Sequence, residues 1–189
     1  RQLLARDERV VALGGDHSIS VPLVRANADI HADITILHLD AHPDLYDELD
    51  GSRLSHACPF ARIMEEGLAT RLVSLGIRAA TPHLREQADR FGAETIYAGR
   101  DWRPAVASLE APIYLSLDLD ILDPAFAPGI SHHEPGGLST RDVLDILHAL
   151  PHPPIGADIV ELNPDRDLQG VTAMVAAKFL KEILAGMLA

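Results

Sequence analysis

Short apolar runs alternate along the chain with stretches of helical periodicity, and this alternation gives the first picture of the fold. Apolar runs predict strands at residues 10–13, 34–39, 72–77, 94–97, 113–119 and 155–162. Helical patterns follow several of them, at residues 21–28 and 83–91 and again in the last third of the chain. Strands that alternate with helices are typical of parallel sheets. We therefore expect an α/β fold with a central, mostly parallel sheet.

Two helices near the C-terminus have clear boundaries or faces. The run from Ser139 to Asp142 has the form of a capping box, and it precedes apolar residues at 143–150, so a helix is expected to begin there. The last helix carries an apolar stripe at helical spacing, which predicts core packing. Its members are Val175, Phe179, Leu180, Ile183, Leu184, Met187 and Leu188.

The run at 113–119 alternates in character from residue to residue. Tyr114, Ser116 and Asp118 share one face of the expected strand, and its apolar residues share the other face. Polar groups also end other expected strands, because His17, Asp40 and Glu161 lie at or just past their ends. In open parallel sheets, ligands bind beyond the carboxyl ends of the strands. We expect these side chains to converge on one edge.

Composition narrows the possible partners. The chain has 189 residues and a formal net charge of −12, with 28 Asp plus Glu against 16 Lys plus Arg. A nucleic-acid partner needs a basic patch, so this balance argues against one, whereas it can steer a cationic substrate. No apolar run is long enough to predict a membrane span. The single cysteine, Cys58, excludes an intrachain disulfide, fits a cytoplasmic location and is expected to be a small buried thiol.

The segment Asp40-Ala41-His42-Pro43-Asp44 is the strongest local signal for chemistry. Carboxylate, imidazole and carboxylate recur at every second residue, and an extended backbone projects all three to one side. Pro43 cannot donate to a strand ladder, so the strand is expected to end there. The pair Asp118 and Asp120 repeats the device within an otherwise apolar run.

These carboxylates need compensation. A buried carboxylate is heavily penalised unless it is paired or bound to a metal, and neither motif has Lys or Arg at its flanks. Two divalent ions would balance the four aspartates, and His17 and His42 would complete the ligand set. Such ions, about 3.5–4 Å apart, can activate a water as a nucleophile. Oxygen-rich sets with two imidazoles favour Mn²⁺, while Zn²⁺, Fe²⁺ and Co²⁺ stay possible.

Three segments together resemble the signatures of the ureohydrolase family, which includes arginases and agmatinases. They are Gly14–Ser18, Asp40–Asp44 and Ser116–Asp120, and the likeness continues through Glu161-Leu162-Asn163-Pro164. Ser55–Ala57, Phe60–Glu65 and Leu122–Leu138 look closest to plant-type arginases and their bacterial relatives.

The resemblance implies a three-layer α/β/α fold with a central parallel sheet and two Mn²⁺ per chain. One metal would be held by His17, Asp40, Asp44 and Asp118, and the other by His42, Asp40, Asp118 and Asp120. Glu161 matches the carboxylate that grips a substrate guanidinium, an interaction that can be bidentate. His56 matches the histidine that shuttles protons, a role that suits an imidazole.

The expected reaction is cleavage of a guanidino C–N bond with release of urea. The substrate would be agmatine, giving putrescine, or L-arginine, giving ornithine. Guanidinobutyrate or formimidoylglutamate as substrate, and a catalytically inactive metal-binding fragment, are the alternatives. Tyr46 disfavours the animal-type arginase mode without naming the substrate. His132, His133 and Glu134 are candidates for the pocket mouth, and the resemblance leaves their roles open.

The remaining histidines carry no motif and are expected to be structural, namely His31, His38, His83, His148 and His152. Residues 1–189 are expected to form a single arginase-like catalytic domain. Family members carry a longer segment before the Gly14-Gly15-Asp16-His17 run, and residue 1 is Arg rather than Met, so we expect an N-terminally truncated sequence that lacks strands. The resemblance also implies a homo-oligomer, a trimer or a hexamer.

Overall fold

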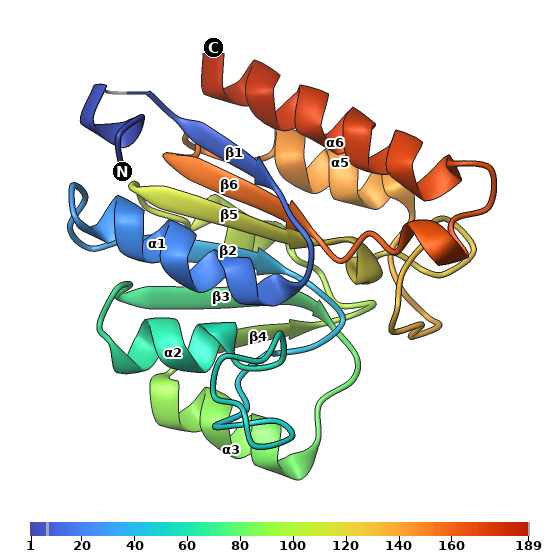
Figure 1. The fold of residues 1–189 in the computed structure, drawn as a ribbon, viewed down its shortest axis with the longest axis horizontal. Helices are drawn as coiled ribbons and strands as arrows, with labels where there is room; N and C mark the ends of the chain where they lie inside the picture. Colours follow the sequence, from blue (N-terminus) through green and yellow to red (C-terminus); the bar gives the residue numbers. More distant parts are fainter. Residues whose placement is uncertain (7, 189) are drawn as a thin grey trace.

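A six-stranded sheet forms the centre of the computed structural model, which describes residues 1–6 and 8–188. The strands are β1 (Val10–Leu13), β2 (Thr35–Leu39), β3 (Arg71–Ile77), β4 (Glu94–Tyr97), β5 (Ile113–Asp118) and β6 (Gly156–Val160). Their order across the sheet is β1-β6-β5-β2-β3-β4, and every neighbouring pair is parallel. All six strands therefore end at the same edge of the sheet (Figure 1).

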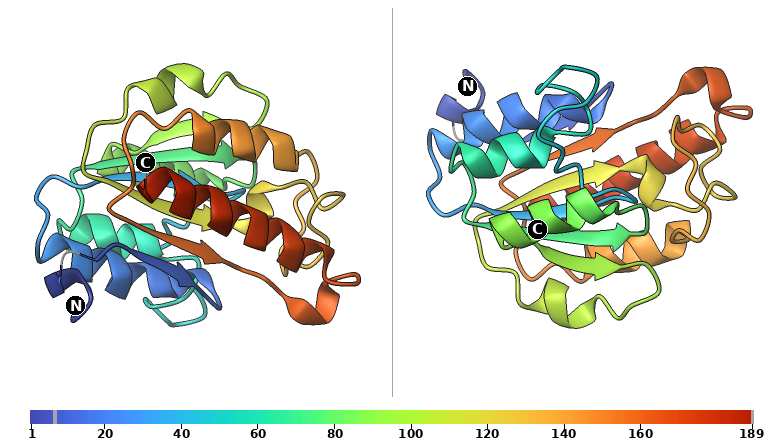
Figure 2. Two further views of the ribbon diagram at one scale, coloured as in Figure 1. Left: turned by 90° about the horizontal axis from the view of Figure 1, so that it is seen from above. Right: turned by 90° about the horizontal axis from the view of Figure 1, so that it is seen from below.

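Helices cover both faces of this sheet, as Figure 2 shows from above and below. One face packs against α1 (Ser20–Ala28), α2 (Pro59–Glu65) and α3 (Pro82–Phe91). The other packs against α4 (Arg103–Ala107), α5 (Thr140–His148) and α6 (Val171–Leu188). The expected three-layer α/β/α arrangement with a parallel sheet is confirmed. Among the described residues, no helix combines the length and apolar character needed to cross a bilayer.

The central strands are buried on both faces, as expected where helices cover a parallel sheet. In β5, Leu115 and Leu117 belong to the core beneath α5 and α6, while Tyr114 packs into the core beneath α1 and α2. The predicted alternation along this strand is thus confirmed. Its even-numbered residues, including Ser116 and Asp118, all lie toward one layer of the molecule.

Helix boundaries follow from local capping. Ser139 and Asp142 form the predicted capping box at the start of α5, with both reciprocal hydrogen bonds present. Thr81 caps α3 by accepting from the backbone N–H of Leu84, and Gly92 ends that helix in the left-handed region. The sequence pattern did not predict α2 and α4, because seven and five residues are too few for a clear helical period. Cys58, directly before α2, is buried as predicted.

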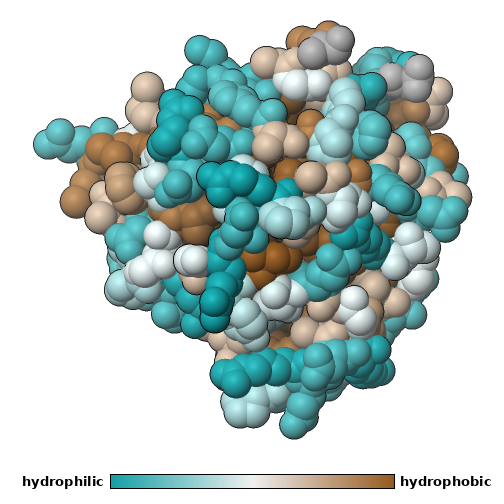
Figure 3. All heavy atoms as spheres, turned by 180° about the vertical axis from the view of Figure 1, so that it is seen from behind, coloured by the Kyte–Doolittle hydropathy of each residue, from teal (hydrophilic) through white to brown (hydrophobic). Residues whose placement is uncertain are grey.

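The apolar stripe of α6 is narrower than predicted. Phe179, Ile183 and Met187 are buried at a spacing of four residues. Leu184 is 40% exposed and Leu188 is 87% exposed, so their expected place in the core is wrong. Each lies one position beyond a buried residue and is therefore turned by about 100° around the helix, away from the sheet. On the face opposite to that of Figure 1, polar side chains cover much of the surface, with smaller apolar areas between them (Figure 3).

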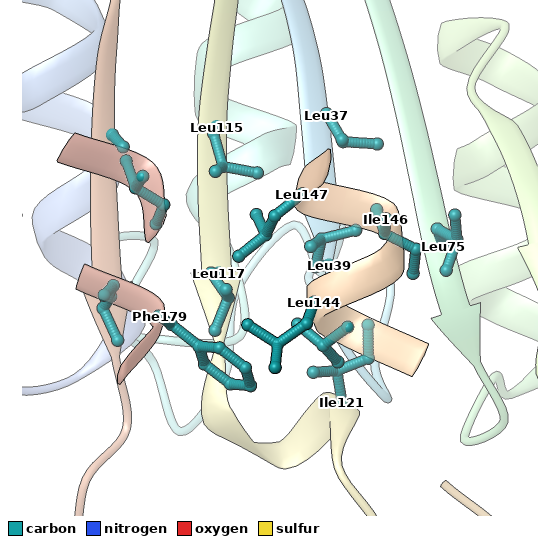
Figure 4. Close-up of a cluster of buried hydrophobic side chains, with 14 of the residues drawn as sticks. Leu37, Leu39, Leu75, Leu115, Leu117, Ile121, Leu144, Ile146, Leu147 and Phe179 are labelled. Atoms are coloured by element: carbon teal, nitrogen blue, oxygen red, sulfur yellow. The ribbon is translucent and has the colours of Figure 1, made fainter. Parts of the chain in front are cut away.

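Phe179 lies against leucines of the sheet and of α5 in the core that Figure 4 shows. Replacing it with alanine removes a fully buried aromatic ring and leaves a cavity. We expect Phe179→Ala to lower the free energy of unfolding by about 3–5 kcal/mol, measured by urea denaturation of the metal-free chain. Met174→Ala on the same helix is the control, because Met174 is 72% exposed and should change stability by less than about 0.5 kcal/mol. A small effect of Phe179→Ala would contradict the packing of α6 described here.

Candidate metal centre

Four neighbouring strands place the residues of the candidate site at one edge of the sheet. His17 begins the 3₁₀ helix η2 (His17–Ile19) after β1, and Asp40 directly follows β2. Asp118 is the last residue of β5, and Glu161 directly follows β6. Since β1, β6, β5 and β2 lie side by side and run parallel, residues far apart in sequence meet here (Figure 1).

The first cluster surrounds the His17 imidazole. Its Nδ1 lies 3.2 Å from Asp40 Oδ2, 3.1 Å from Asp44 Oδ2 and 3.2 Å from Asp118 Oδ2. All four side chains are buried. Asp44 reaches the cluster with a backbone φ of +50°, an uncommon value for a residue with a side chain, so the turn after β2 is held in a specific conformation.

The second cluster adjoins the first and shares Asp40 with it. His42 Nδ1 lies 2.9 Å from Asp120 Oδ2 and 3.4 Å from Asp40 Oδ1. Asp120 belongs to the 3₁₀ helix η3 (Leu119–Ile121), and its Oδ1 accepts a hydrogen bond from the backbone N–H of Ala41. The segments after β2 and β5 are thereby tied together.

Burial and mutual repulsion of these carboxylates raise the pKa of two of them, Asp118 and Asp120, when no metal is bound. Burial raises the pKa of Asp120 to about 7, with the charge of Asp40 adding to the effect. Burial and the charges of Asp120 and Asp40 also raise the pKa of Asp118. Burial opposes ionisation of Asp40 as well, but its three histidine neighbours outweigh it and hold the pKa of Asp40 well below its usual range. The cluster therefore carries more negative charge than its own residues can compensate.

The two imidazoles respond in the opposite direction. Burial alone would lower the pKa of His42, yet hydrogen bonds to Asp120 and Asp40 raise it to about 12. Burial likewise acts against a charged His17, and its three carboxylate neighbours raise its pKa well above the usual value. Each histidine is thus drawn toward a cationic form, which indicates that this site attracts positive charge.

The residues present fit a pair of divalent cations. His17 Nδ1 is a buried ring nitrogen without a hydrogen-bond partner of acceptable geometry, although it faces three carboxylate oxygens. The four aspartates of the two clusters are Asp40, Asp44, Asp118 and Asp120. Among the residues that the structure describes, their only ion pairs are with histidines. Ligand atoms of Asp40, His42 and Asp120 also lie within 4.8 Å of one another, as metal ligands do. Carboxylate oxygens with imidazole nitrogens are a donor set for ions of the Mn²⁺ class.

A cavity of about 180 Å³ opens onto these ligands. Larger cavities of about 390 and 490 Å³ lie elsewhere, but none of these carboxylates lines them. The predicted residues His56, Tyr46, His132 and Glu161 all line the smaller cavity beside the two clusters. The structure therefore brings them together with the candidate ligands.

Glu161 faces the cavity from the end of β6. Its Oε1 accepts a hydrogen bond of 2.8 Å from the backbone N–H of His17. Burial raises the pKa of Glu161, although that hydrogen bond and the nearby His17 charge oppose the effect. Its backbone φ of +69° is strained for a residue other than glycine, and such strain is concentrated at functional sites.

Stacked rings form part of the cavity wall. The imidazoles of His56 and His132 stack with centroids 5.3 Å apart, and His132 also lies edge-on to His42 at 6.1 Å. Tyr46 stacks on His83 at 5.6 Å. His133 is not among the residues lining the cavity, and its Nε2 contacts the carbonyl of Pro128 instead. Glu134 is half-exposed, with its carboxylate 3.9 Å from His42 Nε2.

Arg78 supports the backbone of residues beside this cavity. Its guanidinium donates to the backbone carbonyls of Asp120, Leu122 and Glu134, among others. Gly137 is required beside it, because a Cβ there would lie 2.7 Å from the guanidinium and closer still to the backbone of Leu122. This one half-buried cation thus links η3 to the loop of residues 132–137.

Three polar residues around the ligands were missed as functional candidates. His38, expected to be structural only, bonds Asp40 Oδ2 through Nε2 at 2.7 Å and Ser74 through Nδ1 at 3.1 Å. Ser116 contacts His17 Nε2, and Asp158 contacts Ser116. A signal existed, since His38 and Ser116 each precede a candidate ligand by two residues and share its face of the strand. Asp158 lies on β6 and could be linked to them only by the sheet register.

Comparisons with known proteins agree with this geometry. The Arginase family model matches residues 1–186. "Arginase 1, mitochondrial" of Arabidopsis thaliana is 54% identical over 187 residues, covering 94% of this chain and 54% of that protein. "N(1)-aminopropylagmatine ureohydrolase" of Thermus thermophilus is 43% identical over 164 residues, covering 82% and 55%. The solved arginase of Medicago truncatula superposes with a TM-score of 0.91 at 49% identity, covering 97% of this chain and 62% of that one.

The chain spans about half the length of the curated relatives it matches. The family match over residues 1–186 includes all the segments that bring the candidate ligands together. A family model matching nearly the whole sequence, relatives above 40% identity and a superposable fold all point the same way. The chain belongs to the Arginase family.

Proposed function

We propose that this chain forms the catalytic part of a binuclear metal hydrolase that cleaves a guanidino C–N bond and releases urea. The observation that carries the proposal is the buried His17 Nδ1, which faces three carboxylate oxygens that pair with no Lys or Arg among the described residues. The family of the chain and the names of its relatives support the same reaction class.

One metal would be held by His17, Asp40, Asp44 and Asp118, and the other by His42, Asp40, Asp118 and Asp120. The ions, which we propose to be Mn²⁺, would supply positive charge and activate water as a nucleophile. Asp40 and Asp118 are the shared ligands in this assignment. The geometry supports this assignment, because His17 faces Asp40, Asp44 and Asp118, and His42 faces Asp40 and Asp120.

Glu161 would bind the substrate guanidinium. A carboxylate can accept two parallel N–H donors from that planar cation, which fixes the orientation of the central carbon. The backbone N–H of His17 holds one Glu161 oxygen and so ties this carboxylate to the first metal cluster. Glu161 would thus hold the carbon over the carboxylates that line the floor of the cavity.

His56 would deliver the proton that the reaction requires. Water adds to the guanidino carbon, the bond from that carbon to the chain nitrogen breaks, and the departing amine takes up a proton. The imidazole of His56 lines the cavity and can donate that proton as a general acid. The stack on His132 holds the ring in place.

The names of the plant arginases favour L-arginine as the substrate, which would give urea and ornithine. Agmatine, giving urea and putrescine, is the second candidate, because no Lys or Arg is among the described residues lining the cavity. A substrate carboxylate would therefore need neutral or imidazole donors, such as Tyr46 and His132. The formal net charge of −12 can steer either cationic substrate toward the protein.

Assembly and location stay predictions. We expect a trimer or hexamer, as the family resemblance implies. A cytoplasmic location also stays a prediction, and the names of several plant relatives place those proteins in mitochondria.

The reaction is tested by a substrate panel. The metal-free chain is loaded with Mn²⁺ and incubated with L-arginine, agmatine, guanidinobutyrate and formimidoylglutamate, and urea is measured alongside total product. Urea release from L-arginine or agmatine is expected. Turnover of guanidinobutyrate or formimidoylglutamate, with none of L-arginine or agmatine, would favour a related amidine hydrolase. Metal binding with no turnover on the whole panel would favour an inactive metal-binding protein.

Metal removal should destabilise the fold, because the clustered carboxylates then repel one another without a cation. Adding Mn²⁺ at about a hundred times its Kd should raise the free energy of unfolding by about 2.7 kcal/mol, measured by urea denaturation with and without a chelator. Asp118→Asn removes a shared ligand and should lose most of this rise. Asp145→Asn, on the exposed side of α5, should keep it. An equal response of both variants would argue against the assigned ligands.

Glu161→Gln separates substrate binding from metal binding. The amide keeps an oxygen for the His17 N–H but loses the charge that pairs with a guanidinium. We expect kcat/KM for urea release to fall at least about a hundredfold, roughly 3 kcal/mol, with metal content unchanged. Glu110→Gln, at an exposed position, is the matched control. Full activity of Glu161→Gln would remove Glu161 from the proposed mechanism.

A further inference from the structure

Asp158 is a buried carboxylate in the middle of β6 that contacts no candidate metal ligand directly. Three hydroxyl groups surround it. Its Oδ1 accepts from Ser116 at 2.7 Å, and its Oδ2 accepts from Tyr114 at 2.7 Å and from Ser20 at 3.0 Å. No Lys, Arg or His side chain pairs with it among the described residues. These three hydroxyl donors are therefore the groups that would stabilise a negative charge on Asp158.

The direction of the Ser116 hydroxyl follows from this arrangement. An ionised carboxylate can only accept hydrogen bonds, so the single proton of Ser116 must point to Asp158. Ser116 Oγ also lies 2.8 Å from His17 Nε2. With its proton already committed, Ser116 can only accept from that ring nitrogen. His17 Nε2 must then carry a hydrogen.

The hydrogen on Nε2 also determines whether the other ring nitrogen, Nδ1, is protonated. A neutral imidazole has one N–H and one lone pair, and with the hydrogen on Nε2 the lone pair is on Nδ1. His17 Nδ1 is the atom that faces Asp40, Asp44 and Asp118. The hydrogen bonds from Asp158 through Ser116 thus select the His17 tautomer that presents a lone pair to a cation.

We propose that Asp158 is a positioning residue that acts through Ser116 to hold His17 in the metal-binding tautomer and orientation. The inference rests on the metal centre of the proposed function, and it adds a buried carboxylate that is linked to His17 by two hydrogen bonds. Residues that orient a histidine ligand from behind commonly change metal affinity 10–100-fold when they are replaced. Asp158 would influence the site without touching metal or substrate.

The test measures metal affinity rather than activity. The metal-free 189-residue chain is titrated with Mn²⁺, and free Mn²⁺ is followed by its electron paramagnetic resonance signal. Asp158→Asn has the same shape but no charge to hold the Ser116 proton away from His17. We expect its Mn²⁺ affinity to fall about 10–100-fold, with circular dichroism unchanged. Tyr114→Phe is the matched control, because it also removes a hydrogen bond to Asp158 but leaves Ser116 and His17 in place.

A second variant guards against a folding defect. Ser116→Ala removes the acceptor of the His17 Nε2 hydrogen, so it should weaken Mn²⁺ binding to a similar degree. In the double variant Ser116→Ala/Asp158→Asn, no further loss of Mn²⁺ affinity is expected beyond that of Ser116→Ala, because Asp158 acts only through Ser116. A merely structural Asp158 would instead add its own loss to that of Ser116.

The outcomes separate this inference from the proposed function. A wild-type chain that binds no Mn²⁺ overturns both. A wild-type chain that binds, with a folded Asp158→Asn or a folded Ser116→Ala that binds equally well, overturns the inference alone. Additive losses in the double variant, or a loss in Tyr114→Phe as large as that in Asp158→Asn, also overturn it.

Discussion

Repulsion among Asp40, Asp44, Asp118 and Asp120 is the constraint on which the site depends. These four carboxylates are buried, and among the described residues their ion pairs are all with histidines. Bringing negative charges into a poorly solvated space is costly, and imidazoles alone offset it incompletely. A fold that keeps such a cluster needs positive charge from elsewhere, and a pair of divalent ions would provide it. The same ions would then be placed to act on water and on a bound guanidinium.

The parallel sheet is what makes this convergence possible. Strands β1, β6, β5 and β2 are neighbours, and each contributes a side chain at or just beyond its carboxyl end. The apolar cores on both faces secure the strands, so the polar residues at the edge are held by the packing of residues far from the chemistry. The positive φ values of Asp44 and Glu161 occur at this edge, just past the ends of β2 and β6.

Polar groups one layer further out complete the arrangement. Asp158 and Ser116 stand behind His17, His38 and Ser74 stand behind Asp40, and Arg78 holds the backbone near Asp120 and the loop of His132. These contacts come from strands and turns on several parts of the sheet. They orient His17 and Asp40 and hold the backbone at Asp120, which would lower the cost of organising the site.

The sequence by itself determined the strands, most of the helices and the candidate ligands. Apolar runs marked β1 to β6, because a parallel sheet buries both faces of its strands, and alternate spacing marked Asp40, His42 and Asp44 as neighbours on one side. Short helices such as Pro59–Glu65 were missed because they span too few turns to show a period. Only the tertiary structure decided the strand order, which makes Asp158 a neighbour of Ser116, and the placement of His56 and His132 in the cavity wall while His133 stays outside the lining. Contacts between distant segments depend on packing and register, and local residue patterns carry no record of either.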